Sequence, residues 1–291
     1  MHKKDKYQGY LYILPWLIGF FVLTLYPFVV SFAYSFTEYD MFHIEFVGLK
    51  NYIKIFTEDK IFLQSLGTTI FYTVISVPLK LSVALLVAVL LNKLRRGRGI
   101  YYTIFYLPSI LGSSVALAIL WKYIFKKDGL INLLLGAIGI TGPNWIGDPD
   151  LVLYVMMLLP LWQMGAPMVI FLAALKNVPV DITEAARIDG ASSRKIFFKI
   201  IFPMISPIVF FNLIMQTIEM IQIFTPAYLI TKGGPIKKTY LYSLYLYDTA
   251  FRDSKMGYAS ALSWILFIII ITFTLVFFGL SKKWVYYGDE G

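Results

Sequence analysis

Six long apolar runs dominate this sequence and leave little room for a water-soluble fold. They cover about residues 10–36, 66–91, 100–124, 151–175, 208–230 and 259–280, and a helix of about 20 residues crosses the hydrocarbon of a bilayer. Inside lipid, backbone polar groups must bond within the segment, so runs of this kind must be helical. The sequence therefore predicts an all-α integral membrane protein in which six transmembrane helices form a single domain over residues 1–291.

The composition excludes several classes of site. Only 15% of the residues are charged, against about 25% in ordinary globular domains. The chain has no cysteine and two histidines, so we expect no metal site, no thiol chemistry and no catalytic residues. The formal charge of +9 is more typical of contacts with anionic membrane lipid than of nucleic-acid binding.

The first apolar run is expected to stay in the mature protein. Its length far exceeds the roughly 7–15 residues of a signal-peptide core, although a cleaved signal is the competing interpretation. Basic residues lie close to the inner ends of the first and second spans and predict that both termini face the cytoplasm. These residues are His2, Lys3, Lys4 and Lys6 before the first span, and Lys93, Arg95, Arg96 and Arg98 after the second.

A polar block at residues 179–207 separates the fourth and fifth apolar runs. A connection between neighbouring helices needs only a few residues, so a block of this length indicates a function. Asp181 is expected to cap a short first helix, with Glu184 three residues later, and Gly190 to end it in the left-handed conformation.

A second short helix is predicted in the same block. Ser192 or Ser193 can cap it, and Pro203 is expected to end it. Between them, apolar residues recur at helical spacing. These are Ile196, Phe197, Ile200 and Ile201.

The same block resembles the EAA loop of ABC-importer permeases. That motif reads Glu-Ala-Ala, three residues, Gly, nine residues, Ile, one residue, Leu-Pro, and Phe202 stands here in the leucine position. Flanking residues resemble the carbohydrate-importer branch of the family, and the C-terminus resembles the first-type subunit of an unlike permease pair. The matching residues are Glu184, Ala185, Ala186, Gly190, Ile200 and Pro203.

The resemblance implies a type I ABC-importer permease in the plasma membrane of a prokaryote. Its partners would be a second, related permease, two ABC ATPase subunits and an extracytoplasmic solute-binding protein. ATP and Mg would be used by the ATPase subunits, and the chain itself has no Gly-x-x-x-x-Gly-Lys-Ser/Thr phosphate loop and would bind no cofactor. The predicted ATPase-coupling residues are Glu184, Ala185, Ala186, Arg187, Asp189 and Gly190.

Two ionisable residues, Lys80 and Glu219, lie inside predicted spans and must face protein or water. Steps of 100° per residue place Asn212 and Gln216 within about 60° of Glu219 on one helix face. Such a polar stripe either lines a path for sugar hydroxyls or joins helices, and for Lys80 we expect a pairing role. Trp162 and Gln163 of the fourth span are further candidates for the path.

Two other classes of function are open to a chain of this kind. An ion-coupled secondary transporter would need a proton or ion relay, for which one lysine and one glutamate are meagre. A membrane enzyme would need a cluster of His, Cys or carboxylate groups that the sequence does not show. The sequence does not define which sugar or oligosaccharide an importer would carry.

Overall fold

The structure is a computed structural model that describes residues 12–94, 96–112 and 115–286. Its contacts divide the chain into two compact units, which are described separately. Unit 1 comprises Met1–Phe62 and Tyr245–Ile269, and unit 2 comprises Leu63–Leu244 and Ile270–Gly291. The basic residues His2, Lys3, Lys4, Lys6 and Arg95 lie outside the described residues.

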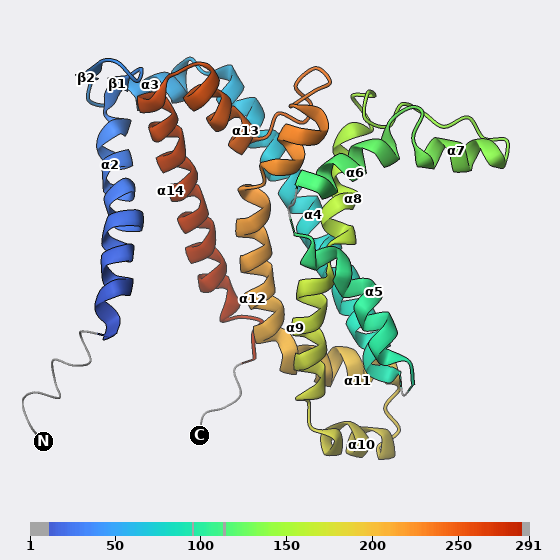
Figure 1. Cartoon of the computed structure of the whole chain (residues 1–291). Coiled ribbons are helices and arrows are strands. Elements are labelled where there is room, and N and C mark those ends of the chain that lie inside the picture. Colours follow the sequence, from blue (N-terminus) through green and yellow to red (C-terminus); the bar gives the residue numbers. More distant parts are fainter. Residues whose placement is uncertain (1–11, 95, 113–114, 287–291) are drawn as a thin grey trace, which may run out of the picture. The chain divides into compact units, whose positions relative to one another are not determined.

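Unit 1 holds the first apolar helix, Tyr12–Ser35, whose most hydrophobic stretch has no residue buried in the structure, as a lipid-facing helix would. A short antiparallel hairpin follows, in which Glu38 pairs with Glu45. The elements of the unit are a π-helical turn Phe20–Leu25, α2 Tyr26–Ser35, β1 Thr37–Tyr39, β2 Ile44–Phe46, α3 Lys50–Thr57, the end of α13 Tyr242–Tyr247, a π-helical turn Asp248–Arg252 and the start of α14 Met256–Ser281 (Figure 1).

Aromatic stacking joins α2 to α14 within unit 1. The ring of Trp264 lies 4.7 Å from Phe28 and 4.6 Å from Phe32 between centroids, and its Nε1 donates a hydrogen bond to Ser31 Oγ. At the end of α2, the buried Asn51 amide donates to two backbone carbonyls, at 3.0 and 2.9 Å. Asn51 therefore fixes the chain between α2 and the hairpin.

Asp59 links three parts of unit 1. Its Oδ1 accepts the Phe62 N–H at 2.9 Å, and its Oδ2 accepts hydrogen bonds from Tyr245 and, at 2.7 Å, from Tyr258. Burial, and then the hydrogen bond to Asp59, raises the pKa of Tyr245, so this phenol remains a donor at physiological pH.

We expect Asp59→Ala to lower the thermal stability of the purified transporter, by the equivalent of about 2–4 kcal/mol. The variant loses a helix cap and the carboxylate oxygen that accepts hydrogen bonds from two partly buried hydroxyls. Glu58→Ala is the matched control, because the Glu58 side chain is exposed and its carboxylate accepts no hydrogen bond from the described residues. Equal melting temperatures for the two variants would contradict the role of Asp59.

Unit 2 is built from helices that run along one another (Figure 1). Helix α9 packs against both α5 and α12, and α6 packs against α7. A buried cluster of apolar residues between α6 and α8 is tied by Trp121, whose Nε1 donates to the Val155 carbonyl at 3.1 Å. The helices are α4 Lys60–Lys93, α5 Arg98–Ile110, α6 Val115–Phe125, α7 Leu130–Ala137, α8 Val152–Trp162, α9 Gly165–Lys176, α10 Val180–Ile188, α11 Ser193–Ile196, a π-helical turn Phe197–Ile201, α12 Phe202–Ile221, a π-helical turn Ala227–Thr231 and the end of α14.

By length and composition, the described residues contain four helices able to cross a membrane, or six if each of two bent helix pairs is one span. The bounds differ from the sequence-based spans. The third predicted span is divided between α5 and α6, and the fourth is bent by 44° between α8 and α9. The fifth predicted span, 208–230, is too long at its C-terminal side, because α12 ends at Ile221. The single-domain organisation remains a prediction.

Candidate functional site

The polar block forms the short helix α10 at the end of unit 2 where α9 ends (Figure 1). Gly190 follows α10 with φ +79°, the left-handed conformation expected at this position, and Ser192 caps the next helix by accepting the Lys195 N–H at 3.4 Å. The prediction that Asp181 caps α10 is wrong. The helix begins directly after Pro179, so Asp181 lies in its first turn, where a negative charge still favours the helix dipole.

The second helix of the block does not end at Pro203. A continuous helix, Ser193–Ile221, runs from the block through α12. Pro203 lies inside this helix, directly after the π-helical turn, where the hydrogen-bond pattern changes from π to α. Further along, Pro207 cannot donate to the Pro203 carbonyl, and Ser206 Oγ donates to that oxygen instead, at 2.6 Å.

The predicted coupling residues form an exposed surface on α10 and the turn after it. Glu184, Ala185, Arg187, Asp189 and Gly190 are exposed, and Ala186 is partly exposed. A Cβ at Gly190 would meet no atom within 4 Å, so the glycine is needed there for its backbone conformation. Their contact with an ATPase subunit remains a prediction.

Large apolar side chains extend the same surface. Ile188 is 87% exposed and Ile182 is 43% exposed. The short helix therefore presents apolar and charged groups together, as a helix that inserts into a partner's groove would.

The fourth span is broken at Gln163, between α8 and α9, and this break is held by α5. Gln163 Nε2 donates to the Gly112 carbonyl at 2.6 Å, and Ser109 Oγ donates to the Gln163 carbonyl at 3.3 Å. Pro167 cannot bond to the Gln163 carbonyl, so the serine hydroxyl replaces the missing donor. In membrane proteins, irregular backbone of this kind is tolerated where it is enclosed by protein or lines a cavity.

A close approach between α5 and α9 stabilises this break. A Cβ at Gly165 would lie 2.7 Å from the Phe105 carbonyl oxygen and 2.8 Å from Tyr106 Cα. Only glycine permits this distance between the two backbones.

A buried tyrosine supports α8, the first half of the same span. Pro160 leaves the Met156 carbonyl without its helical donor, and the fully buried Tyr72 of α4 donates to that oxygen at 3.2 Å. We expect Tyr72→Phe to lower the melting temperature of the transporter, because an unpaired buried carbonyl costs about 1–3 kcal/mol.

Tyr154→Phe on α8 is the matched control for that measurement. Tyr154 is 53% exposed, so it loses the same hydroxyl without leaving a buried group unpaired. A drop of equal size in both variants would contradict the role assigned to Tyr72.

A cavity of about 300 Å³ lies where the break in the fourth span meets the end of α12. Gln163, Glu219 and Gln222 line it together with Phe224 and apolar neighbours. Lys80 Nζ lies 3.8 Å from Glu219 Oε2, with side chains that are 4% and 51% exposed, respectively. Glu219 therefore joins α4 to α12 and also faces the cavity.

The other predicted path residues lie elsewhere. Asn212 is buried, and its amide donates to the Ile208 carbonyl of its own helix at 2.9 Å. Trp162 stacks on Trp121 at 5.7 Å between ring centroids. Gln216 has a buried Oε1 that accepts no hydrogen bond from the described residues. The structure thus brings Gln163 and Glu219 to one cavity, and the roles of all these residues in transport remain predictions.

Lys80 belongs to a longer polar stripe on α4, whose other members the sequence pattern does not single out. Its members are spaced four, four, three and four residues apart, which places them on one helix face. All are buried. Small hydroxyl residues are common in apolar runs, so the sequence alone gives little sign of the stripe. The stripe consists of Ser65, Thr69, Thr73, Ser76 and Lys80.

The fold is that of ABC-transporter permeases. A chain in the crystal structure of a bacterial alginate ABC transporter, in complex with an alginate pentasaccharide-bound periplasmic protein, superposes with a TM-score of 0.84 at 19% identity and 96% coverage of both chains. This likeness confirms the predicted all-α permease fold.

Similar sequences include permeases of ABC and sugar transport systems. The probable ABC transporter permease protein YesP of Bacillus subtilis is 48% identical, covering 99% of this chain and 94% of the relative. The lactose transport system permease protein LacF of Rhizobium radiobacter is 33% identical, covering 95% and 94%. Residues 91–283 match the model of the binding-protein-dependent transport system inner membrane component. The chain belongs to this family and is a multi-pass protein of the cell membrane.

Proposed function

We propose that the chain is the first-type permease subunit of an ATP-driven importer for a sugar or oligosaccharide. The observation that carries the proposal is the exposed helix α10, which a short turn with left-handed Gly190 joins to the continuous helix Ser193–Ile221. The far end of that helix holds Glu219 at the cavity. The family to which the chain belongs supports a carbohydrate substrate, and so do the names of similar proteins, which include lactose and trehalose/maltose permeases.

Separate subunits supply the rest of the machine in this proposal. Two ABC ATPase subunits bind ATP and Mg, a second permease completes the path, and an extracytoplasmic binding protein delivers the sugar. The chain itself holds no cofactor and has no ATPase activity. Both termini and α10 face the cytoplasm, where closing ATPase subunits pull α10 and shift the helices between inward-open and outward-open states.

The cavity chemistry fits a carbohydrate. Amide and carboxylate groups of Gln163, Gln222 and Glu219 can bond sugar hydroxyls, and Phe224 offers a ring face. Discontinuous helices near a polar cavity are the arrangement in which membrane transporters hold their substrates.

Two measurements test the proposal. Uptake by cells should stop on ATP depletion and continue after ion gradients are collapsed, whereas the reverse result would indicate an ion-coupled transporter. The purified complex should contain a cassette ATPase whose rate rises with sugar-loaded binding protein. Turnover of a substrate by the chain without its ATPase would instead indicate a membrane enzyme.

Gln216→Ala separates path lining from helix joining. A normal yield of complex with altered substrate-stimulated ATPase activity supports a place on the path. Loss of assembly supports a role in holding the helices together.

A further inference from the structure

A cavity of about 400 Å³ lies between α10, the start of α11 and the ends of α4 and α9. Three cations from different elements contribute to its lining, and no carboxylate does so: Asp181, Glu184 and Asp189 of the same block are not among its residues. The three are Lys93 of α4, Arg187 of α10 and Arg194 of α11.

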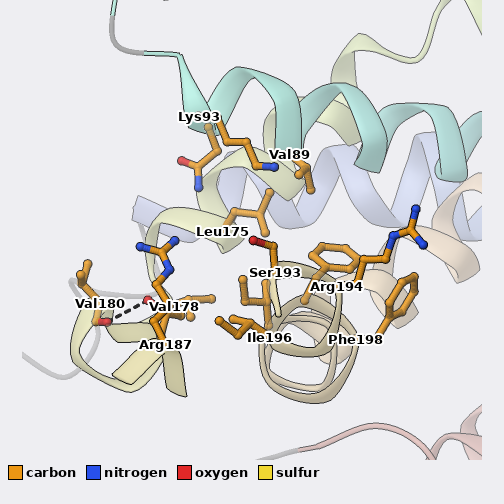
Figure 2. A pocket seen from close by; sticks show the side chains of 14 residues that line it. Val89, Lys93, Leu175, Val178, Val180, Arg187, Ser193, Arg194, Ile196 and Phe198 are labelled. Atoms are coloured by element: carbon orange, nitrogen blue, oxygen red, sulfur yellow. Dashed lines mark hydrogen bonds between the residues drawn. The ribbon is translucent and has the colours of Figure 1, made fainter. Parts of the chain in front are cut away.

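None of these cations forms an ion pair with another described residue. Figure 2 shows Arg187 on one side of the cavity, Arg194 beside Phe198 on the other, and Lys93 toward α4, with Ser193 among them. Guanidinium and ammonium groups that line one cavity, with no carboxylate in its lining, are suited to the oxygens of a phosphate.

The remaining lining is largely apolar. Val89 comes from α4, Leu175 from α9 and Phe197 from the helix that follows α11. Phe198, at the rim, is 66% exposed. A soluble phosphate would leave these groups without a partner, whereas an amphiphile would cover them.

The position of the cavity also favours an amphiphile. It lies where α4, a helix long and apolar enough to cross the membrane, reaches its last residue, Lys93. In the cytoplasmic orientation proposed above, this end of the helix lies on the side of the leaflet that is rich in anionic lipid.

We propose that this cavity binds the phosphate headgroup of one anionic phospholipid, with Lys93, Arg187 and Arg194 around the phosphate and an acyl chain along the apolar lining. The proposal rests on the cytoplasmic placement of α10 given above. The bound lipid would connect α4 and α9 to the coupling helix, so lipid composition would affect how movement of α10 reaches the membrane helices.

The test is lipid retention by the complete transporter complex, reconstituted in nanodiscs of phosphatidylcholine and phosphatidylglycerol, re-extracted and analysed by mass spectrometry. Each cation near a membrane surface contributes a factor of about five in affinity for anionic lipid. Lys93→Gln with Arg194→Gln should therefore lower retained phosphatidylglycerol by at least about fivefold. The Lys93→Arg variant should retain phosphatidylglycerol, which would show that position 93 tolerates a substitution that keeps the charge.

Lys176→Gln with Lys199→Gln is the matched control. It removes two basic residues from the same end of unit 2, neither of which lines the cavity. Equal lipid loss in both double variants would overturn the proposal, and so would displacement of the lipid by inorganic phosphate, or lipid-free complex in the wild type. Lipid retention does not require the complex to transport anything. If the importer assignment is wrong, the uptake assay would therefore fail while the lipid-retention result stays the same.

Discussion

Replacing Gly190 by valine is expected to reduce transport by tenfold or more. The residue has φ +79°, and for residues other than glycine the left-handed region costs about 1–2 kcal/mol, with β-branched side chains the least tolerant. The space around the Cβ is open, so the effect must arise from the backbone. A changed turn would redirect α10 and its exposed Ile188 relative to any ATPase groove.

Gly190→Asn is the control for this experiment, because asparagine visits the left-handed region at low cost. The measurement is uptake together with the ATPase rate of the purified complex. The valine variant should show either poor retention of the ATPase or hydrolysis without uptake, and the asparagine variant should remain close to wild type. Wild-type uptake and normal co-purification in the valine variant would refute the coupling role.

Glu219→Ala is expected to destabilise the transporter strongly. It removes the carboxylate 3.8 Å from the buried Lys80 ammonium, and breaking a buried ion pair by deleting one partner costs about 3–5 kcal/mol. Because Glu219 is half exposed, solvent screens the pair and the lower end of this range applies. The yield and melting temperature of the assembled complex measure the effect.

The double variant Lys80→Met with Glu219→Ala identifies the cause. If the loss comes from an unpaired buried ammonium, removing that charge as well should recover most of the stability, as a double-mutant cycle would show. If Glu219→Ala instead assembles and melts normally while losing sugar-stimulated ATPase activity, Glu219 is a path residue and the predicted destabilisation is wrong.

Local signals in the sequence predict that the apolar runs are helical, and they predict two of the four ends of the short helices. The left-handed Gly190 and the Ser192 cap follow from residue chemistry that acts within a few positions. The error at Pro203 has a different origin. Proline commonly ends a helix, but here it lies in the first turn after a π-helical segment, which the sequence pattern does not reveal.

The cavity depends on contacts between distant segments, which the sequence pattern does not specify. The sequence shows Gln163 and Glu219 as polar residues in apolar runs. Their side chains line the same cavity because of the break in the fourth span and the place where α12 ends. That break is held by Ser109 and Gly112, more than 50 positions away in the chain. The α4 stripe is harder to predict, because hydroxyl residues in an apolar run usually bond to their own helix and so indicate no tertiary contact. Here Thr73 Oγ1 and Ser76 Oγ have no hydrogen-bond partner among the described residues.

The uninterrupted helix Ser193–Ile221 acts mechanically as a lever. At about 1.5 Å per residue, its 29 residues span about 40 Å from Ser193 to the cavity. The direction in which each side chain points around the helix axis matters as much as the length of the helix. One extra residue between Pro207 and Asn212 would turn Glu219 by about 100° relative to Ser193, while leaving every residue type in place. Torque that passes the turn at Gly190 and reaches Ser193 would therefore act on the carboxylate at the cavity through one continuous helix.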